Sequence, residues 1–268
     1  MEAISLFQQS RLDEAIASLS NQLRQQPADL DLRYAMAGLV AFAGDFDRAL
    51  VHLDFIAAEN PALATAVAMY TSSMHAEEER RRIYATGHVP GTDRENEQAV
   101  KRRVQLRQQL RAGDAGAAAT TMATIAAEPV ANAAVDGAGV AAARFADMDE
   151  GFGAVLEIFV GGRCLWVPTQ NLRSLEFVAP RGLLDLLWAQ CAITTTAGVR
   201  YSAHLPVLYH GTHARSDAQV RCGHKTEWHD ELGVAFRGYG ARVFTVGDRE
   251  VGILELRKVQ FAASGTAG

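Results

Sequence analysis

The sequence predicts an α+β protein of two domains, a tetratricopeptide-like all-α helical repeat domain followed by a small, mostly antiparallel β-rich domain. In the first 128 residues apolar side chains recur three and four positions apart, as in helices, and the pattern repeats after 34 positions. From about residue 153 apolar and polar residues alternate, as in strands. We therefore expect a helical domain at 1–128, an Ala/Gly-rich linker at 129–152, a β-rich domain at 153–261 and a loose tail at 262–268.

The overall composition is that of an ordinary globular protein. Of the 268 residues 49% are apolar and 21% are charged, and the net charge of −5 gives no electrostatic basis for nucleic-acid binding. The first residues lack the basic and apolar regions of a secretory signal, and no stretch approaches the roughly 20 apolar residues that cross a bilayer. The 3 cysteines are an odd number at wide spacing, which is typical of reduced thiols. We therefore expect a cytoplasmic protein that binds no nucleic acid and does not insert into a membrane.

Six positions in the helical half have an equivalent residue 34 positions further along the chain. A small residue lets the chain turn tightly between two helices, an alanine lets the helices approach closely, and a proline separates one unit from the next. A weaker third copy runs through 113–129. The alternative is a helical bundle in which the match is accidental. The paired positions are Ser10/Gly44, Leu12/Phe46, Ala15/Ala49, Ile16/Leu50, Leu19/Leu53 and Pro27/Pro61.

Two more helices are predicted between the second and third copies. A long helix is expected at about 62–84, after which the glycines and proline of 87–91 break the chain. The residues 92–95 match a capping box, which predicts a helix that ends near Arg111. The long helix carries the charge run Glu77–Arg82, which we interpret as a solvated face, with partner binding as the alternative.

In the β-rich half the clearest signal is a hairpin. Two alternating segments, 155–159 and 163–167, flank the pair Gly161-Gly162. Further strands are expected at 172–178, 243–246 and 251–256, and 182–188 predicts one or two helical turns. We expect the tryptophans at 166, 188 and 228 to anchor the core of this half.

The motif search favours no catalytic or nucleotide-binding site. Gly137-Ala138-Gly139-Val140-Ala141-Ala142 spells a dinucleotide-binding fingerprint, but that chemistry needs a strand before the turn and a full helix after it. The preceding residues are Ala-rich, and acidic residues follow soon after, so we favour a turn in the linker. The sequence has neither a Gly-x-Ser-x-Gly nucleophile elbow nor a phosphate-binding Gly-x-x-x-x-Gly-Lys loop.

Histidines and one cysteine gather between residues 204 and 229. Zinc would need three or four of them to converge, but no pair has the spacing of a recognised metal motif. We therefore favour surface or hydrogen-bonded histidines and expect neither a metal nor a cofactor. A metal-dependent hydrolase built on this cluster is the alternative. The members are His204, His210, His213, Cys222, His224 and His229.

The second half also contains short motifs in a fixed order. They are Val155-Leu156-Glu157, Trp166-Val167-Pro168, Leu183-x-Asp185-Leu186-x-Trp188-Ala189, Leu205-Pro206-Val207-Leu208-Tyr209, Thr226-Glu227-Trp228 and Gly238-Tyr239-Gly240-Ala241-Arg242. Together they resemble the ImpE/TagJ family, accessory proteins encoded in type VI secretion clusters. Asp147-x-Asp149 fits the pattern of that family too. The family-motif residues are Trp166, Pro168, Asp185, Trp188, Pro206, Tyr209, Thr226, Glu227, Trp228, Gly240 and Arg242.

The resemblance implies a non-enzymatic adaptor in the cytoplasm. It implies two partners: the small sheath subunit, bound through an N-terminal helix, and the ClpV-type AAA+ ATPase that disassembles contracted sheaths. This sequence departs from the family pattern at Cys222-Gly223-His224-Lys225, before Thr-Glu-Trp, and at Ala241, where the family has glutamine. Roles that rest on those polar side chains are therefore not carried over.

One helix face in the second repeat is the candidate groove for the sheath subunit. Gly38 and Ala41 would leave room for a partner backbone, Tyr34 and Phe42 would supply apolar contact area, and Asp31 lies on the same face. The alternative is that both aromatic residues belong to the core. A repeat scaffold or chaperone for an unrelated peptide is a further functional alternative.

Overall fold

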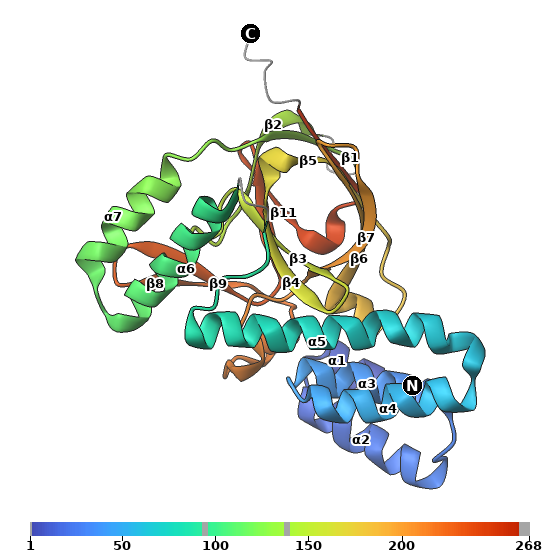
Figure 1. Cartoon of the computed structure of the whole chain (residues 1–268). Coiled ribbons are helices and arrows are strands. Elements are labelled where there is room, and N and C mark those ends of the chain that lie inside the picture. The colour runs from blue at the N-terminus through green and yellow to red at the C-terminus, as the bar shows by residue number, and fades with distance from the viewer. Residues whose placement is uncertain (1, 93–95, 137–139, 263–268) are drawn as a thin grey trace.

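The computed structural model describes residues 2–92, 96–136 and 140–262 (Figure 1). Part of the expected capping box, 93–95, and the tail from 263 onward lie outside the described residues. A short helix, η1 (Pro61–Leu63), precedes the longest of the α-helices. The helices of the first half are α1 (Glu2–Gln8), α2 (Leu12–Gln25), α3 (Leu30–Phe42), α4 (Phe46–Glu59), α5 (Ala64–Thr86), α6 (Glu97–Ala112) and α7 (Ala115–Ala126).

The first four helices form two pairs, and equivalent residues of the two pairs are 34 positions apart, as the sequence repeat predicts. Helix α2 begins at residue 12 and α4 at residue 46, and the equivalent residues Ala15 and Ala49 are both fully buried. Gly44 turns the chain between α3 and α4 with a φ of 81°, which glycine adopts without strain. Asp45 then caps α4, since its side chain accepts a hydrogen bond from the Arg48 N–H at 3.2 Å. The predicted helix pairs are present, and their classification as tetratricopeptide repeats stays a prediction.

Helix α5 covers 64–86, close to the predicted 62–84, and ends at Gly87, whose φ is 73°. It lies against strands β3 (Val155–Val160) and β4 (Arg163–Pro168) (Figure 1). The charge run in this helix is a solvated face only in part: Glu78 and Arg82 are exposed, whereas Glu79 and Arg80 are only 5% and 2% exposed. The interpretation was wrong for Glu79 and Arg80, because these two side chains pair with groups of the sheet instead of with water.

The described part of the second half is dominated by a ten-stranded antiparallel sheet that curls round on itself (Figure 1). Helix η4 (Leu183–Leu186) lies between two of its strands in the sequence. In sheet order the strands are β11 (Arg249–Gly252), β10 (Val243–Val246), β2 (Val140–Asp147), β1 (Asn132–Asp136), β12 (Lys258–Phe261), β5 (Leu172–Phe177), β6 (Trp188–Thr195), β7 (Arg200–Pro206), β3 (Val155–Val160) and β4 (Arg163–Pro168).

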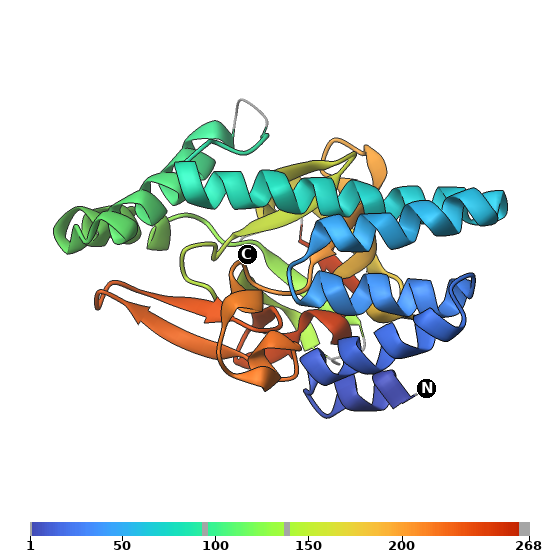
Figure 2. The ribbon, with the colours of Figure 1, turned by 90° about the horizontal axis from the view of Figure 1, so that it is seen from below.

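A separate hairpin projects from this sheet. It consists of β8 (Glu227–Glu231) and β9 (Ala235–Tyr239), and Figure 2 shows it extending on the same side as α7. Short helices occur in the connections around it and elsewhere in the second half. They are η3 (Thr169–Asn171), η5 (Thr212–Ala214), α8 (Ala218–Arg221) and η6 (Ile253–Glu255).

Most of the strands that the sequence signalled clearly are confirmed. The hairpin over 155–167 is β3–β4, the segments 172–178 and 243–246 are β5 and β10, and the turn at 182–188 contains η4. The expected strand at 251–256 is corrected, because the chain leaves β11 at Gly252 and enters η6. Glu255 makes this turn favourable by accepting a hydrogen bond from the Gly252 N–H at 3.1 Å.

The stretch for which we expected a linker contains two strands of the main sheet. β1 pairs with β2 and with β12, and its residues Ala133 and Val135 are buried. Alanine-rich segments have little intrinsic strand propensity, so these two strands could not be predicted from the local sequence. A dinucleotide-binding site at the Gly137-x-Gly139 fingerprint is excluded, because the residues from Val140 onward form β2 and not the helix that such a site needs. The residues Gly137–Gly139 themselves lie outside the described residues.

One apolar core joins the helical half to the sheet. The ring of Phe46 in α4 lies 6.0 Å from the indole of Trp188 in β6, and Leu183 of η4 packs over Gly38 of α3. Both halves contribute to the same cluster of buried side chains. The boundaries of the two expected domains stay a prediction, whereas the α+β class is confirmed.

The contact between α3 and η4 can be tested at Gly38. A Cβ at this position would lie 2.5 Å from Leu183 Cβ, so we expect Gly38→Ala to lower the free energy of unfolding by about 1–3 kcal/mol. The control is Gly116→Ala in α7, where the nearest atom would be 3.8 Å away and the higher helix propensity should add up to about 1 kcal/mol. Urea denaturation followed by circular dichroism measures both, and equal effects would contradict a tight α3–η4 contact.

Candidate functional site

A buried ion-pair network lies where α5 meets the sheet. The carboxylate of Glu157 in β3 accepts hydrogen bonds from Arg80 of α5 at 2.8 Å and from Arg242 at 2.7 Å. Trp166 of β4 donates its indole N–H to the same carboxylate at 3.1 Å. The side chains of Arg80, Glu157 and Arg242 are 2%, 0% and 1% exposed. The network therefore fixes α5, β3, β4 and the start of β10 relative to one another.

Arg242 extends the network to a second carboxylate. It forms an ion pair with Asp147 at the end of β2, and Tyr209 donates its hydroxyl to Asp147 at 2.8 Å. The backbone N–H of Val243 donates to the Tyr209 hydroxyl at 3.2 Å. On the helix side, Arg80 also donates to the Leu208 carbonyl at 3.1 Å. Polar groups from five segments of the chain thus pair with one another in the interior, and among the described residues only the Nε of Arg80 within this network is left without a hydrogen-bond partner.

The network strongly shifts the pKa values of its carboxyl groups. Burial alone would raise the pKa of Glu157, but the guanidinium groups of Arg80, Arg242 and Arg107 outweigh it and lower the pKa to about 2. At Asp147 burial dominates over the pairing with Arg242, and the pKa rises to about 6. Glu157 therefore stays ionised at neutral pH and is the fixed negative centre of the network.

A second polar cluster holds α5 further along its length. Tyr70 donates its hydroxyl to Asp185 at 2.6 Å, and Asp185 also accepts a hydrogen bond from the Gly182 N–H at 3.1 Å, which caps η4. The ring of Tyr70 stacks on His204 of β7, with centroids 5.8 Å apart. Ser73 Oγ lies 2.6 Å from His204 Nδ1, inside the protein. Asp185, one of the family-motif residues, therefore positions η4 against α5.

Other family-motif residues attach the β8–β9 hairpin to the core. Thr226 donates its hydroxyl to the Ala241 carbonyl at 2.7 Å, and the ring of Trp228 meets Tyr209 edge-on at 5.8 Å. Gly240 has a φ of 105°, and a Cβ there would lie 2.0 Å from the carbonyl oxygen of Lys225, in the segment that precedes β8. Only glycine fits that position without strain.

The remaining motif residues have simple structural positions. Trp188 donates its indole N–H to Glu77 of α5 at 3.3 Å, and Glu227 pairs with a lysine at 3.1 Å. Pro168 and Pro206 are the last residues of β4 and β7. Together with the residues of the ion-pair network, they account for the sequence motifs as parts of a framework.

The expected partner groove on α3 is covered by the chain itself. Leu183 of η4 packs on Gly38, and Phe42 is 1% exposed. This differs from the expectation of an open groove, because η4 occupies the space that the small residues leave. Two of the five groove residues remain partly or fully accessible, and three are buried: Asp31 is exposed, Tyr34 is intermediate, and Gly38, Ala41 and Phe42 are buried.

The histidines and Cys222 do not converge. His210 stacks on Tyr84 with centroids 3.9 Å apart, whereas His224 Nδ1 lies 2.9 Å from Ser10 Oγ in the helical half. His229 contacts Arg215 at 2.7 Å. Within 2–92, 96–136 and 140–262, no group of three or more His, Cys, Asp or Glu side chains has a geometry that could hold a metal ion.

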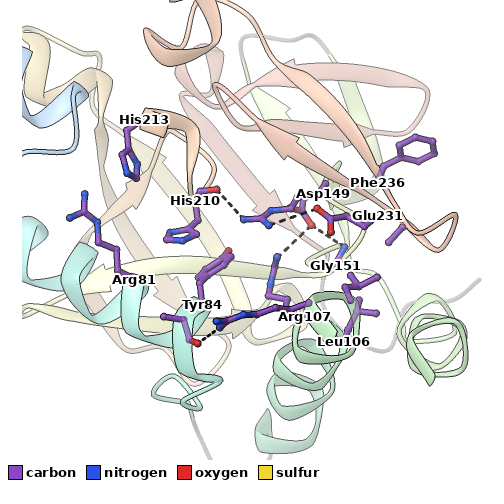
Figure 3. Close-up of a pocket in the computed structure, with 15 residues that line it drawn as sticks. Arg81, Tyr84, Leu106, Arg107, Asp149, Gly151, His210, His213, Glu231 and Phe236 are labelled. Atoms are coloured by element: carbon purple, nitrogen blue, oxygen red, sulfur yellow. Dashed lines mark hydrogen bonds and ion pairs between the residues drawn. The ribbon is translucent and has the colours of Figure 1, made fainter. Parts of the chain in front are cut away.

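A cavity of ≈ 680 Å³ lies between α5, α6 and the β8–β9 hairpin (Figure 3). Its centre is aromatic and cationic: the guanidinium of Arg107 lies 4.7 Å over the ring of Tyr84 and 4.4 Å over that of Phe152. The Tyr84 hydroxyl reaches Glu157 at 3.3 Å, so the cavity adjoins the ion-pair network. The sequence did not single out Tyr84 or Arg107, although Asp149 of the Asp147-x-Asp149 motif lines the same cavity.

Comparison with known proteins agrees with this framework. The family model for ImpE protein matches residues 139–260. The type VI secretion system accessory component TagJ of Pseudomonas aeruginosa is 33% identical over 264 residues, which covers 97% of this chain and 91% of that protein. The crystal structure of VPA1032 from Vibrio parahaemolyticus has a similar fold, with a TM-score of 0.86, 19% identity and 98% of each chain covered.

Fold and site thus define an α+β protein whose helical half is held to a curled antiparallel sheet by interior ion pairs. The chain belongs to the ImpE family, and its similarity to TagJ extends over nearly the whole length of both proteins. The resemblance found in the sequence motifs is confirmed.

The central role of Glu157 can be measured directly. Glu157→Gln leaves Arg80 and Arg242 buried without their shared counter-charge, so we expect the free energy of unfolding to fall by about 3–5 kcal/mol. The matched control is Glu176→Gln, which breaks an exposed pair with Arg200 and should cost at most about 1 kcal/mol. Similar losses in the two variants, measured by urea denaturation, would show that the network is not central.

His204 should make the fold sensitive to mild acid. Burial lowers its pKa from 6.5 to about 4, so the unfolded chain takes up a proton at a pH where the folded protein resists it. Neutral His204 makes its full contribution to the free energy of unfolding above about pH 6.5. As the pH falls toward 4, up to about 3 kcal/mol of that free energy is lost. The stability difference between wild type and His204→Gln should therefore shrink across that range, and a difference independent of pH would contradict this.

Proposed function

We propose that the protein is an accessory component of a type VI secretion system and acts through protein–protein contacts in the cytoplasm. The observation that carries the proposal is the relationship to TagJ, which is described as such a component and matches 97% of this chain. Among the described residues no helix combines the length and apolar character needed to cross a membrane. The most strongly shifted carboxyl groups, Glu157 and Asp147, are paired inside the core, which supports a structural role for them and a non-enzymatic protein.

The finer proposal is an adaptor between the small sheath subunit and the ClpV-type AAA+ ATPase. An adaptor works best as a rigid body, because little conformational entropy is then lost when a partner binds. The ion-pair network and the Tyr70–Asp185 cluster hold α5 to the sheet at two places, which supports such rigidity. The partners themselves are proposed from the family resemblance.

Exposed apolar side chains favour the β8–β9 hairpin as one contact surface. Leu232 in its turn and Phe236 in β9 are 48% and 51% exposed, although the hairpin is firmly attached to the core. Large apolar and aromatic side chains on a rigid support are typical anchors of protein interfaces. The hairpin replaces the α3 groove as the surface where we place a partner.

Affinity capture tests both the adaptor role and the hairpin as a contact surface. The tagged full-length chain, purified from its own cytosol, should enrich the small sheath subunit and the ClpV-type ATPase. Leu232→Ser combined with Phe236→Ser should reduce recovery of a partner at least about tenfold. The control, Val178→Ser with Val199→Ser, removes two other exposed apolar side chains and should leave recovery unchanged. Failure of the wild type to enrich either protein would contradict the adaptor role.

A further inference from the structure

The cavity beside α6 carries a local excess of positive charge. Its lining includes four arginines, two carboxylates and two histidines, whereas the whole chain has a net charge of −5. Burial lowers the pKa of both histidines, that of His210 to about 2, so the imidazoles are neutral at pH 7. The four arginines are Arg81, Arg107, Arg111 and Arg237. The arginines therefore exceed the carboxylates by two charges in a partly enclosed space.

Arg107 is the least satisfied of these arginines. Its Nη2 lies 3.6 Å from Asp149 Oδ1, which is an ion pair without a hydrogen bond. Within the part of the chain that the structure describes, the buried Nε and Nη2 of Arg107 have no hydrogen-bond partner. Buried donors without partners cost free energy, and a bound oxygen anion would relieve that cost. Asp149 does not satisfy these donors, because its Oδ1, which accepts the Gly151 N–H at 3.0 Å, lies beyond hydrogen-bond distance of Arg107 Nη2.

The neighbouring guanidinium groups are already held in place. Arg237 donates to the His210 carbonyl at 3.2 Å and lies 3.8 Å from Glu231. Arg81 donates to the Gly44 carbonyl at 2.7 Å. Figure 3 shows the side chains of Tyr84, His210 and Arg107 close together. Because these groups are ordered without a ligand, an anion would bind with little additional loss of side-chain entropy.

The rest of the wall is apolar. Leu106 and Leu110 of α6 face Ala235 and Phe236 of the hairpin across the cavity. A ligand that bears only charge would leave this side unfilled, whereas an apolar or aromatic group attached to the anion would cover it. The volume of ≈ 680 Å³ lies within the range of roughly 300–1,000 Å³ that is usual for small-molecule sites.

We propose that this cavity binds a small organic anion, in which a phosphate or carboxylate group is attached to an apolar or aromatic body. Arg107 and Arg237 would contact the oxygen anion, and Leu106, Leu110 and Phe236 would contact the body. Phe236 borders both this cavity and the proposed partner surface, but Arg107 and Arg237 take no part in the proposed partner contacts, so binding of the anion can be tested independently of them.

Isothermal titration of the full-length protein with four probes tests the proposal. Phenyl phosphate and benzoate carry both features, inorganic phosphate carries only the anion, and phenol carries only the ring. We expect phenyl phosphate or benzoate to bind at least about tenfold more tightly than inorganic phosphate and phenol, and to bind more weakly as salt is added. The tighter of the two combined probes identifies the anion as phosphate or carboxylate.

Substitutions locate the binding. Arg107→Gln and Arg237→Gln should each weaken the better probe at least about tenfold, and Arg107→Lys should retain part of the affinity. Arg200→Gln, which removes an exposed arginine of a surface pair, should leave the affinity unchanged. If Arg107→Gln does not fold, as judged by circular dichroism, Arg237→Gln alone decides. Three results would each overturn the proposal. Phenol could bind as tightly as phenyl phosphate, no probe could bind at millimolar concentration, or the folded variants could keep the affinity of the wild type.

Discussion

Glu157 must remain paired with Arg80 and Arg242, and much of the architecture depends on this requirement. An ionised group in the interior costs several kcal/mol unless opposite charges and hydrogen bonds surround it. Here the donors come from α5, from β4 through Trp166, and from the residue before β10, so pairing one carboxylate orients three elements around β3. The apolar contacts between the two halves add free energy, but they do not specify orientation as closely as these hydrogen bonds do.

The residues that carry the family resemblance belong largely to this framework. Trp166, Tyr209 and Arg242 are members of the buried network, and Asp185 fixes η4 against α5. Gly240 is needed where two backbone segments approach each other closely. Such motifs identify the fold of the family, because they describe how the helical half is held to the sheet. The surfaces that we propose for partners and ligands lie elsewhere, on the hairpin and in the cavity next to it.

An element could be predicted from the sequence where the residues that determine its structure lie within or next to that element. The proline at 61 and the chain break at 87–91 predicted the bounds of α5 to within two residues, and the Gly161-Gly162 pair predicted the β3–β4 hairpin. Alanine-rich β1 and β2 were missed because only their neighbours in the sheet make them strands. The α3 groove was misjudged for a similar reason: η4, which fills it, comes more than a hundred residues later. Tertiary partners of this kind leave no periodic signal.

Tyr84 connects the buried network with the cavity. Its hydroxyl contacts Glu157, while its ring lies between His210 and the guanidinium of Arg107. The floor of the cavity is thus made of the same interior that holds α5 to the sheet, whereas one wall is the projecting hairpin. Charge in the cavity acts on the network through Arg107, since this arginine helps to lower the pKa of Glu157. An anion bound there would stabilise the folded protein by mass action, because it binds the folded chain and not the unfolded one.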